Sequence, residues 1–143
     1  MLEPGVYHKE KFNLLETLSE FLKEVSPIDG AVASFIGLVK SVSDLGKDVS
    51  ELEVESYVEH ATPTIRRICE EVSAKYQVSR VLIYHLMGRF GIGEPLVLVL
   101  VSGRSRNNVF PALQEAVERY KREPALFKKE VFIDGSSRWV SHI

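Results

Sequence analysis

The stretch GEPLVLVLVSGRSRNN, residues 93–108, decides the fold. Its run from Leu96 to Val101 is apolar at every position, so both faces of the strand that it predicts must be covered. A connection with glycine and proline precedes this run, and a polar loop from Ser102 to Asn108 follows it. The sequence therefore predicts a central strand that leads through a polar loop into a helix.

Apolar residues at helical spacing predict three helices before and after this strand. Thr62-Pro63 predicts the start of the second helix, because a hydroxyl cap followed by proline favours initiation. Pro111 fits the third helix only in its first turn, so Asn107 or Asn108 is the expected cap. The predicted helices cover residues 10–25, 62–76 and 109–121.

Runs of β-branched and aromatic residues between turn signals predict the strands. We expect the turn at residues 44–47 to join the first two of them in a β-hairpin. The predicted strands cover residues 31–39, 52–57, 81–86, 96–101, 126–133 and 138–143. This order predicts an α+β fold, with a mixed sheet and two or three helices, in a single domain of residues 1–143.

Composition narrows the class of protein. The 143 residues are 45% hydrophobic and 27% charged, a balance typical of globular chains. The N-terminus has no apolar segment after a basic start, and the longest apolar run is too short to cross a bilayer. One cysteine excludes an intramolecular disulfide framework, and the four histidines have no metal-ligand spacing. We therefore expect a cytoplasmic protein without a metal.

Positive charge is concentrated late in the chain. Residues 104–129 contain seven Lys or Arg against three Asp or Glu, whereas residues 1–103 contain 10 against 15. A mildly acidic protein that gathers cations in one short segment is expected to bind an anion there. The alternative interpretation is a solvated helix end that is basic for no functional reason.

The loop between the central strand and the third helix is the first candidate site. Arg104 and Arg106 stand beside a predicted helix N-terminus, whose free N–H groups favour phosphate or carboxylate. The loop lacks the spacing of a phosphate-binding Walker motif.

The second candidate site comprises the lysines around Pro124. Lys121 closes the third helix, where a cation also favours the helix dipole. Lys128 and Lys129 are neighbours in a predicted strand, so they point to opposite faces and only one can line a given pocket. Two lysines that converge near arginines lower each other's pKa, which favours a neutral amine as a base or nucleophile.

Two further reactive residue types have structural interpretations. Cys69 lies on the apolar stripe of the second helix and is expected to be a small core residue. His85, at the end of a predicted strand, is expected to be a hydrogen-bonded structural histidine.

Several segments together resemble the catalytic (large) subunit of molybdopterin synthase. The family's strand ending in G-x-V-R, its I-x-H-R-x-G segment, its L-K-x-x-x-P-x-W-K-x-E motif and its R-W-V each have a similar segment here, in the same order. The resemblance covers about residues 28–140. The segments that carry it are GAVASFIGLVK (30–40), LEVESY (52–57), IYHLMG (83–88), GE (93–94), YKREPALFKKE (120–130) and RWV (138–140).

The resemblance implies a fold and a reaction. The fold is an α+β fold of α/β-hammerhead type, and the assembly is a homodimer within a heterotetramer that includes two small ubiquitin-like sulfur-carrier subunits. The reaction converts cyclic pyranopterin monophosphate to molybdopterin by forming a dithiolene. The sulfur comes from a thiocarboxylate on the carrier's C-terminal Gly-Gly tail. No cofactor, metal, membrane or nucleic acid is implied.

The resemblance also assigns residues. The two family lysines fall on Lys121 and Lys128, which we expect to be catalytic. Lys40 replaces the arginine of the G-x-V-R motif, and Ser105-Arg106 occupies the position of a family His-Arg pair. The resemblance leads us to expect that four residues bind substrate: Lys40, Ser105, Arg106 and, in the same loop, Arg104. Lysine at position 40 keeps the charge but loses the bidentate geometry of arginine.

Two other functions remain as alternatives. A non-catalytic scaffold of the same fold is compatible with serine at position 105. A small RNA-binding module could use the basic segment 104–129, although this segment has few aromatic residues for base stacking and the whole chain is acidic.

Overall fold

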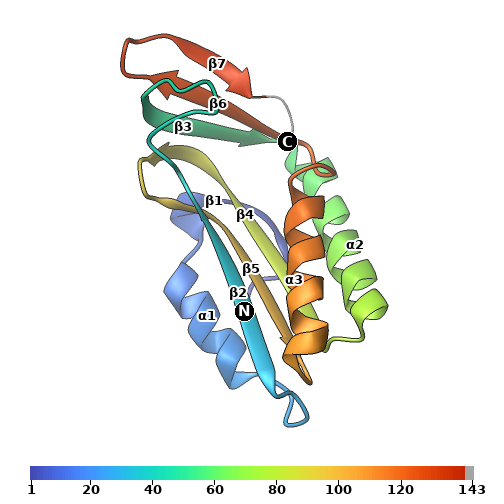
Figure 1. Ribbon diagram of the computed structural model, residues 1–143. Helices are drawn as coiled ribbons and strands as arrows, with labels where there is room; N and C mark the ends of the chain where they lie inside the picture. Colours follow the sequence, from blue (N-terminus) through green and yellow to red (C-terminus); the bar gives the residue numbers. More distant parts are fainter. Residues whose placement is uncertain (141–143) are drawn as a thin grey trace.

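The computed structural model describes residues 1–140. These residues form a seven-stranded sheet and three α-helices (Figure 1). The strand order is β2-β5-β4-β3-β6-β7, and β1 pairs with β4. The strands are β1 (Gly5–His8), β2 (Ala31–Leu38), β3 (Val49–Ser56), β4 (Arg80–Gly91), β5 (Pro95–Gly103), β6 (Leu126–Phe132) and β7 (Ser137–Val140). The helices are α1 (Leu14–Lys23), α2 (Val58–Tyr76) and α3 (Arg106–Tyr120), with a short 3₁₀ helix at Lys9–Lys11.

The predicted fold class is confirmed. β1 runs parallel to β4 and every other paired strand is antiparallel, so the sheet is mixed. The strand β1 has no counterpart in the sequence prediction, because four residues are too few for a periodic pattern. Residues 141–143 of the predicted last strand lie outside the described residues.

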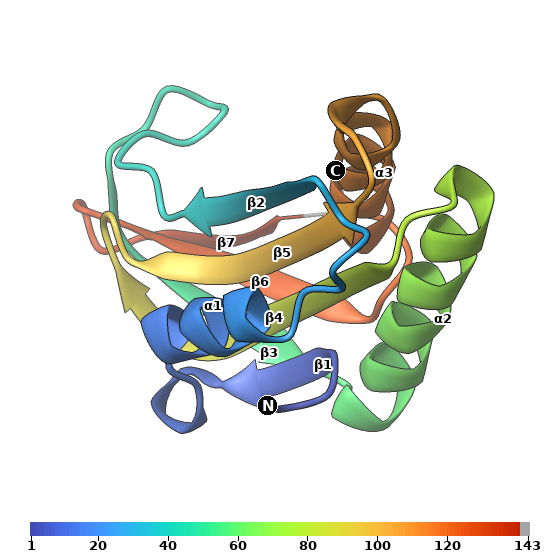
Figure 2. The ribbon, with the colours of Figure 1, turned by 90° about the horizontal axis from the view of Figure 1, so that it is seen from below.

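Strand β5 is central, as predicted. It lies between β2 and β4, and residues 96–101 are all at least 95% buried. Val97, Val99 and Val101 face the core beneath α2 and α3, whereas Leu98 and Leu100 pack with Phe21 of α1 on the other face. Figure 2 shows α1 on one side of the sheet and the two longer helices together on the other.

The predicted helix starts are wrong at two prolines. Helix α2 begins at Val58, so Pro63 lies inside it, and the Thr62 hydroxyl accepts a hydrogen bond from Val6 N of β1 at 3.2 Å. Helix α3 begins at Arg106, so Pro111 also lies inside the helix. Each proline costs an intrahelical hydrogen bond, and burial of the surrounding helix face against the sheet offsets this cost.

The predicted β-hairpin is also wrong. β2 pairs with β5, whereas β3 pairs with β4 and β6, so two strands separate β2 from β3 in the sheet. The intervening turn does form: Gly46 has φ +78°, and one bridge joins Val42 to Asp48. Turn residues identify a change of direction, but the pairing of the strands depends on which apolar faces meet in the core.

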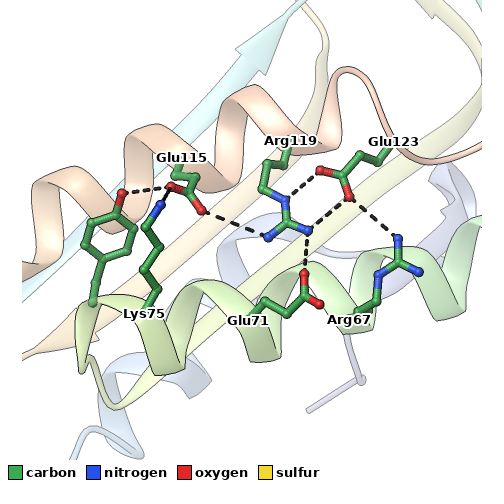
Figure 3. A network of polar contacts seen from close by, with 7 residues as sticks. Arg67, Glu71, Lys75, Glu115, Arg119 and Glu123 are labelled. Carbon is green, nitrogen blue, oxygen red and sulfur yellow. Dashed lines mark hydrogen bonds and ion pairs between the residues drawn. The ribbon is translucent and has the colours of Figure 1, made fainter.

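Helices α2 and α3 are joined by a network of ion pairs centred on Arg119 (Figure 3). Its guanidinium donates to Glu123 and to Glu71, each at 2.6 Å, and lies 4.0 Å from Glu115. Glu115 also accepts from Lys75 at 2.7 Å. The Arg119 side chain is 17% exposed, so solvent screens these contacts less than it screens a typical surface pair. The network fixes the C-terminal turn of α3 against α2.

This network leads to a prediction about stability and pH. We expect Arg119→Met to lower the free energy of unfolding by about 1–2 kcal/mol at pH 7, because three carboxylates then lose their shared cation. The Arg119 hydrogen bond lowers the pKa of Glu123. The stabilising effect of this hydrogen bond is therefore fully present above the ordinary glutamate pKa and is lost as the pH falls from there through the lowered pKa of the folded state. Urea unfolding at pH 7 and pH 3, followed by circular dichroism, measures the difference.

The matched control is Arg122→Met, which removes an exposed arginine from the same turn. We expect it to change stability little at either pH. An Arg119→Met effect as large at pH 3 as at pH 7 would show that packing, and not the ion pairs, is responsible.

Candidate functional site

A cavity of about 400 Å³ lies where β2, the end of α3 and β6 meet, a volume suited to a small-molecule substrate. Its apolar lining includes Phe35, Leu96, Leu126 and Val140. The titratable side chains that line it are Lys40, Asp44, His85, Tyr120, Lys121, Lys128 and Glu130. Segments that are distant in sequence therefore assemble one polar site within an apolar rim.

Three of the predicted site residues meet in this cavity. Lys121 follows the last residue of α3, Lys128 lies on β6, and Lys40 follows β2 at the exposed edge of the cavity. Lys40 is 70% exposed and forms an ion pair of 2.8 Å with Asp44. The three lysines give the cavity the cationic character needed to hold an anion.

The environment of Lys128 favours loss of its proton. Burial, with a smaller contribution from the positive charge of Lys121, lowers the pKa of the Lys128 ammonium. Burial, together with the nearby charge of Lys121, thus makes Lys128 a better proton donor than an exposed lysine. The arrangement can bind anionic groups and transfer protons to or from them.

The predicted difference between neighbouring lysines is confirmed. Lys128 lines the cavity, whereas Lys129 points to the other face of the sheet, where it forms an ion pair of 3.0 Å with Glu53. The Lys129 ammonium also lies 5.6 Å from the centre of the Trp139 ring. Alternation of side chains along β6 therefore separates one basic residue from the other.

The loop with Arg104, Ser105 and Arg106 does not reach the cavity. It lies at the N-terminus of α3, whereas Lys121 lies at the C-terminus of the same 15-residue helix. At 1.5 Å per residue the two ends are about 22 Å apart. The structure thus divides the basic segment 104–129 between two distant places on the molecule.

The predicted cap of α3 is corrected in this loop. Ser105 occupies the cap position, and its hydroxyl donates a hydrogen bond of 3.0 Å to the side chain of Asn108. The Asn108 amide in turn donates to the carbonyl of Tyr76 at the end of α2. Asn108 therefore joins two helix ends, a role that depends on a residue far away in the sequence.

Sequence reasoning missed several side chains of the cavity. Tyr120 is 3% exposed, and Glu130 accepts a hydrogen bond of 2.9 Å from Arg138 across the β6–β7 pair. Gly37 also shapes the wall, because a Cβ atom there would lie 2.5 Å from Val97. Residues two apart in a strand point to the same face, so the spacing between Lys128 and Glu130 along β6 was the signal that could have identified Glu130.

His85 is only partly the structural histidine that the sequence predicts. It is completely buried, and its Nδ1 lies 3.0 Å from the carbonyl oxygen of Leu86. Its other nitrogen has no hydrogen-bond partner within residues 1–140, and the ring lines the cavity.

Cys69 is a core residue, as predicted. It is 6% exposed among the apolar side chains of α2, and burial raises the pKa of its thiol to about 12. A thiol in this state is a poor nucleophile.

Across residues 1–140 no three His, Cys, Asp or Glu side chains are grouped so that they could hold a metal ion. In the same part of the chain no helix combines the length and apolar character needed to span a membrane.

Comparison with known proteins places the chain in a family. The family model described as MoaE protein matches residues 7–123. The molybdopterin synthase catalytic subunit of Bos taurus is 31% identical over 115 residues, which are 80% of this chain and 60% of the relative. The chain thus spans less than two thirds of the length of that curated relative.

Solved structures agree with this result. The crystal structure of molybdopterin synthase from Staphylococcus aureus is 28% identical, covers 99% of both chains and superposes with a TM-score of 0.87. A protein–protein complex of subunits 1 and 2 of molybdopterin-converting factor from Helicobacter pylori 26695 shares the fold, with 16% identity, a TM-score of 0.75, and coverage of 97% of this chain and 89% of that chain. Because the family model matches most of the chain and the solved structure covers 99% of it, the chain belongs to the MoaE protein family.

Proposed function

We propose that this protein transfers sulfur from a thiocarboxylated carrier protein to cyclic pyranopterin monophosphate and so forms the dithiolene of molybdopterin. The observation that carries the proposal is the convergence of Lys40, Lys121 and Lys128 in one cavity. Both reactants are anions, one a cyclic phosphate and the other a C-terminal thiocarboxylate. A cationic cavity holds them together and stabilises the negative charge that develops on the reacting atoms. The names of the curated relatives support the same reaction.

Lys121 and Lys128 have different roles in this proposal. In each of two transfers, the thiocarboxylate sulfur of one carrier forms a bond to a substrate carbon, and an oxygen substituent leaves that carbon, either as water or as the phosphate oxygen when the cyclic phosphate opens. Hydrolysis then cleaves the bond between this sulfur and the carrier's acyl carbon, and the carrier leaves as a carboxylate. Lys121 has the main acid–base or nucleophilic role, and Lys128 binds substrate and transfers a proton. The lowered pKa of Lys128 supports proton transfer, because a general acid is most effective when its pKa is close to the working pH.

The proposed sulfur donor is a small carrier subunit with a C-terminal Gly-Gly tail. The apolar rim around Phe35, Leu126 and Val140 suits an extended tail without side chains, and the lysines beyond it suit the terminal thiocarboxylate. The Helicobacter pylori complex of two subunits of molybdopterin-converting factor supports a two-subunit assembly.

The loop of residues 104–106 lies at the other end of α3 from the cavity, and its place in the proposed reaction depends on a homodimer. We propose that Arg104, Ser105 and Arg106 bind substrate in the cavity of a second copy of this chain, because α3 separates them from their own cavity. Serine can replace a histidine here as a hydrogen-bond donor to phosphate, with the helix N-terminus and the arginines contributing positive charge. Ser105→Ala is then expected to raise KM more than it lowers kcat.

The structure favours sulfur transfer over RNA binding. A nucleic-acid site needs a continuous basic surface. Here Arg119 forms ion pairs with three carboxylates, and Lys121 and Lys128 line a cavity. The remaining basic residues of the segment are divided between the two ends of α3, about 22 Å apart.

Reconstitution with a thiocarboxylated carrier and the cyclic precursor tests the reaction. We expect Lys121→Ala to lower the rate of dithiolene formation roughly 100-fold or more, and Lys128→Ala to lower it somewhat less, because each removes a proton-transfer group. Lys129→Ala is the matched control, since its side chain lies on the opposite face, and it should retain nearly full activity. Equal losses for Lys128→Ala and Lys129→Ala would contradict the assigned site, and absence of product with the unmodified chain would contradict the reaction.

Mixed dimers test the role of the loop. Arg106→Ala and Lys121→Ala should each impair the homodimer. A heterodimer of the two variants keeps one cavity with both side chains intact, so a statistical mixture should recover about a quarter of normal activity, as expected for a symmetric dimer. No recovery on mixing, with subunit exchange verified by mass spectrometry, would show that the loop does not complete a partner's cavity.

A further inference from the structure

The His85 side chain occupies the interior end of the cavity. It lies on β4 and is completely buried, between Tyr120 at the end of α3 and the lysine side of β6. The centres of the His85 and Tyr120 rings are 5.7 Å apart. The titratable groups that face this region are Tyr120 and Lys121 from the α3 side and Lys128 and Glu130 from β6. His85 is thus a titratable side chain in the cavity for which the proposed reaction has no role.

Its hydrogen bonding determines which nitrogen carries the proton. Nδ1 lies 3.0 Å from the carbonyl oxygen of Leu86, and a carbonyl can only accept. Nδ1 must therefore be the protonated nitrogen, which leaves Nε2 with a free lone pair in the neutral ring. This Nε2 is buried and has no partner within residues 1–140. Buried acceptors are nearly always satisfied, so this lone pair requires an explanation.

The ring stays neutral at working pH. Burial is the main cause and the positive charge of Lys128 a second, and together they lower the pKa of His85 to about 3. An imidazole with this pKa does not act as a physiological acid. It is instead a permanent hydrogen-bond acceptor, directed into a cavity that contains ammonium groups.

Lys128 is the cation that needs such an acceptor. Its side chain is half-buried, and no carboxylate within residues 1–140 lies at ion-pair distance from its ammonium. Glu130, the carboxylate on the same face of β6, is held by Arg138 at 2.9 Å. An ammonium that is partly removed from water and has no anion beside it needs neutral acceptors, and the flexible stem of lysine allows the ammonium to move toward one.

We propose that His85 is a positioning residue: the Lys128 side chain turns from its place in the structure so that its ammonium donates a hydrogen bond to His85 Nε2, which holds it in place for the reaction. Because the hydrogen bond is made to the charged form, it opposes the loss of the proton that burial and Lys121 favour. His85 thereby sets both the position of Lys128 and the pH at which it changes charge. The proposal rests on the proposed function only in giving Lys128 a catalytic role.

Two substitutions at His85 distinguish the effect of losing the hydrogen-bond acceptor from the effect of losing the volume of the ring. His85→Gln places an amide oxygen near the position of Nε2, whereas His85→Leu removes the acceptor and fills a similar space. The measurement is the rate of acetylation of Lys128 by acetic anhydride as a function of pH, followed by mass spectrometry of the isolated chain. We expect His85→Leu to raise the rate at pH 7 about tenfold, equivalent to a fall of about one unit in the Lys128 pKa. His85→Gln should react like the unmodified protein.

Tyr120 serves as the internal control for access, because this residue is 3% exposed and the centre of its ring lies 5.7 Å from that of His85. A cavity that has opened would expose the Tyr120 hydroxyl, so its acetylation must not increase in His85→Leu. An unchanged Lys128 rate in His85→Leu, equal rates in the Gln and Leu variants, or a parallel gain at Tyr120 would each overturn the proposal.

A second measurement needs no substitution at His85. ¹⁵N NMR of the ring should show a protonated Nδ1, and Lys128→Met should shift the Nε2 resonance while that of Lys129→Met matches the unmodified protein. A protonated Nε2, or no response to Lys128→Met, would overturn the proposal even where His85→Leu fails to fold. Neither measurement uses carrier or precursor, so failure of the sulfur-transfer assay is distinguishable from failure of this inference.

Discussion

Strand β5 carries apolar side chains on both faces, and water must be excluded from both of them. This requirement places α1 on one face of the sheet and α2 with α3 on the other. Since α3 follows β5 directly, its direction along the sheet brings its C-terminal end to the side where β2 and β6 approach each other. Burial of one strand thus decides where Lys121 and the cavity lie.

The polar contacts around this core determine how well the site is held. Arg119 joins the last turn of α3 to α2, immediately before Tyr120 and Lys121. Across the cavity, the pairing of β6 with β3 and β7 sets which face Lys128 occupies. The cavity lysines Lys121 and Lys128 are therefore positioned by rigid elements on both sides, which is what the proposed proton transfer and anion binding need.

The charged groups of the cavity differ in their exposure to solvent and in the groups beside them. Lys40 is exposed and paired with Asp44, whereas Lys128 is half-buried beside a neutral imidazole. An uncharged His85 adds no repulsion to a site that already contains several cations. Within one chain, the positions of Arg104 and Arg106 at the other end of α3 also keep their charges away from this cavity.

The α+β class, the central strand, the buried Cys69 and the opposite directions of Lys128 and Lys129 could all be predicted from the sequence, because side-chain periodicity and hydrophobicity are local properties. The pairing of β2 with β5, the starts of α2 and α3 five residues before Pro63 and Pro111, and the place of His85 could not be predicted. Each depends on contacts between residues far apart in the chain, and burial of whole apolar faces outweighs local preferences there. The sequence by itself determined which residues could carry charge and which had to be buried. Only the tertiary structure decided which charges share a cavity, because 15 residues of helix separate groups that appear as one basic segment.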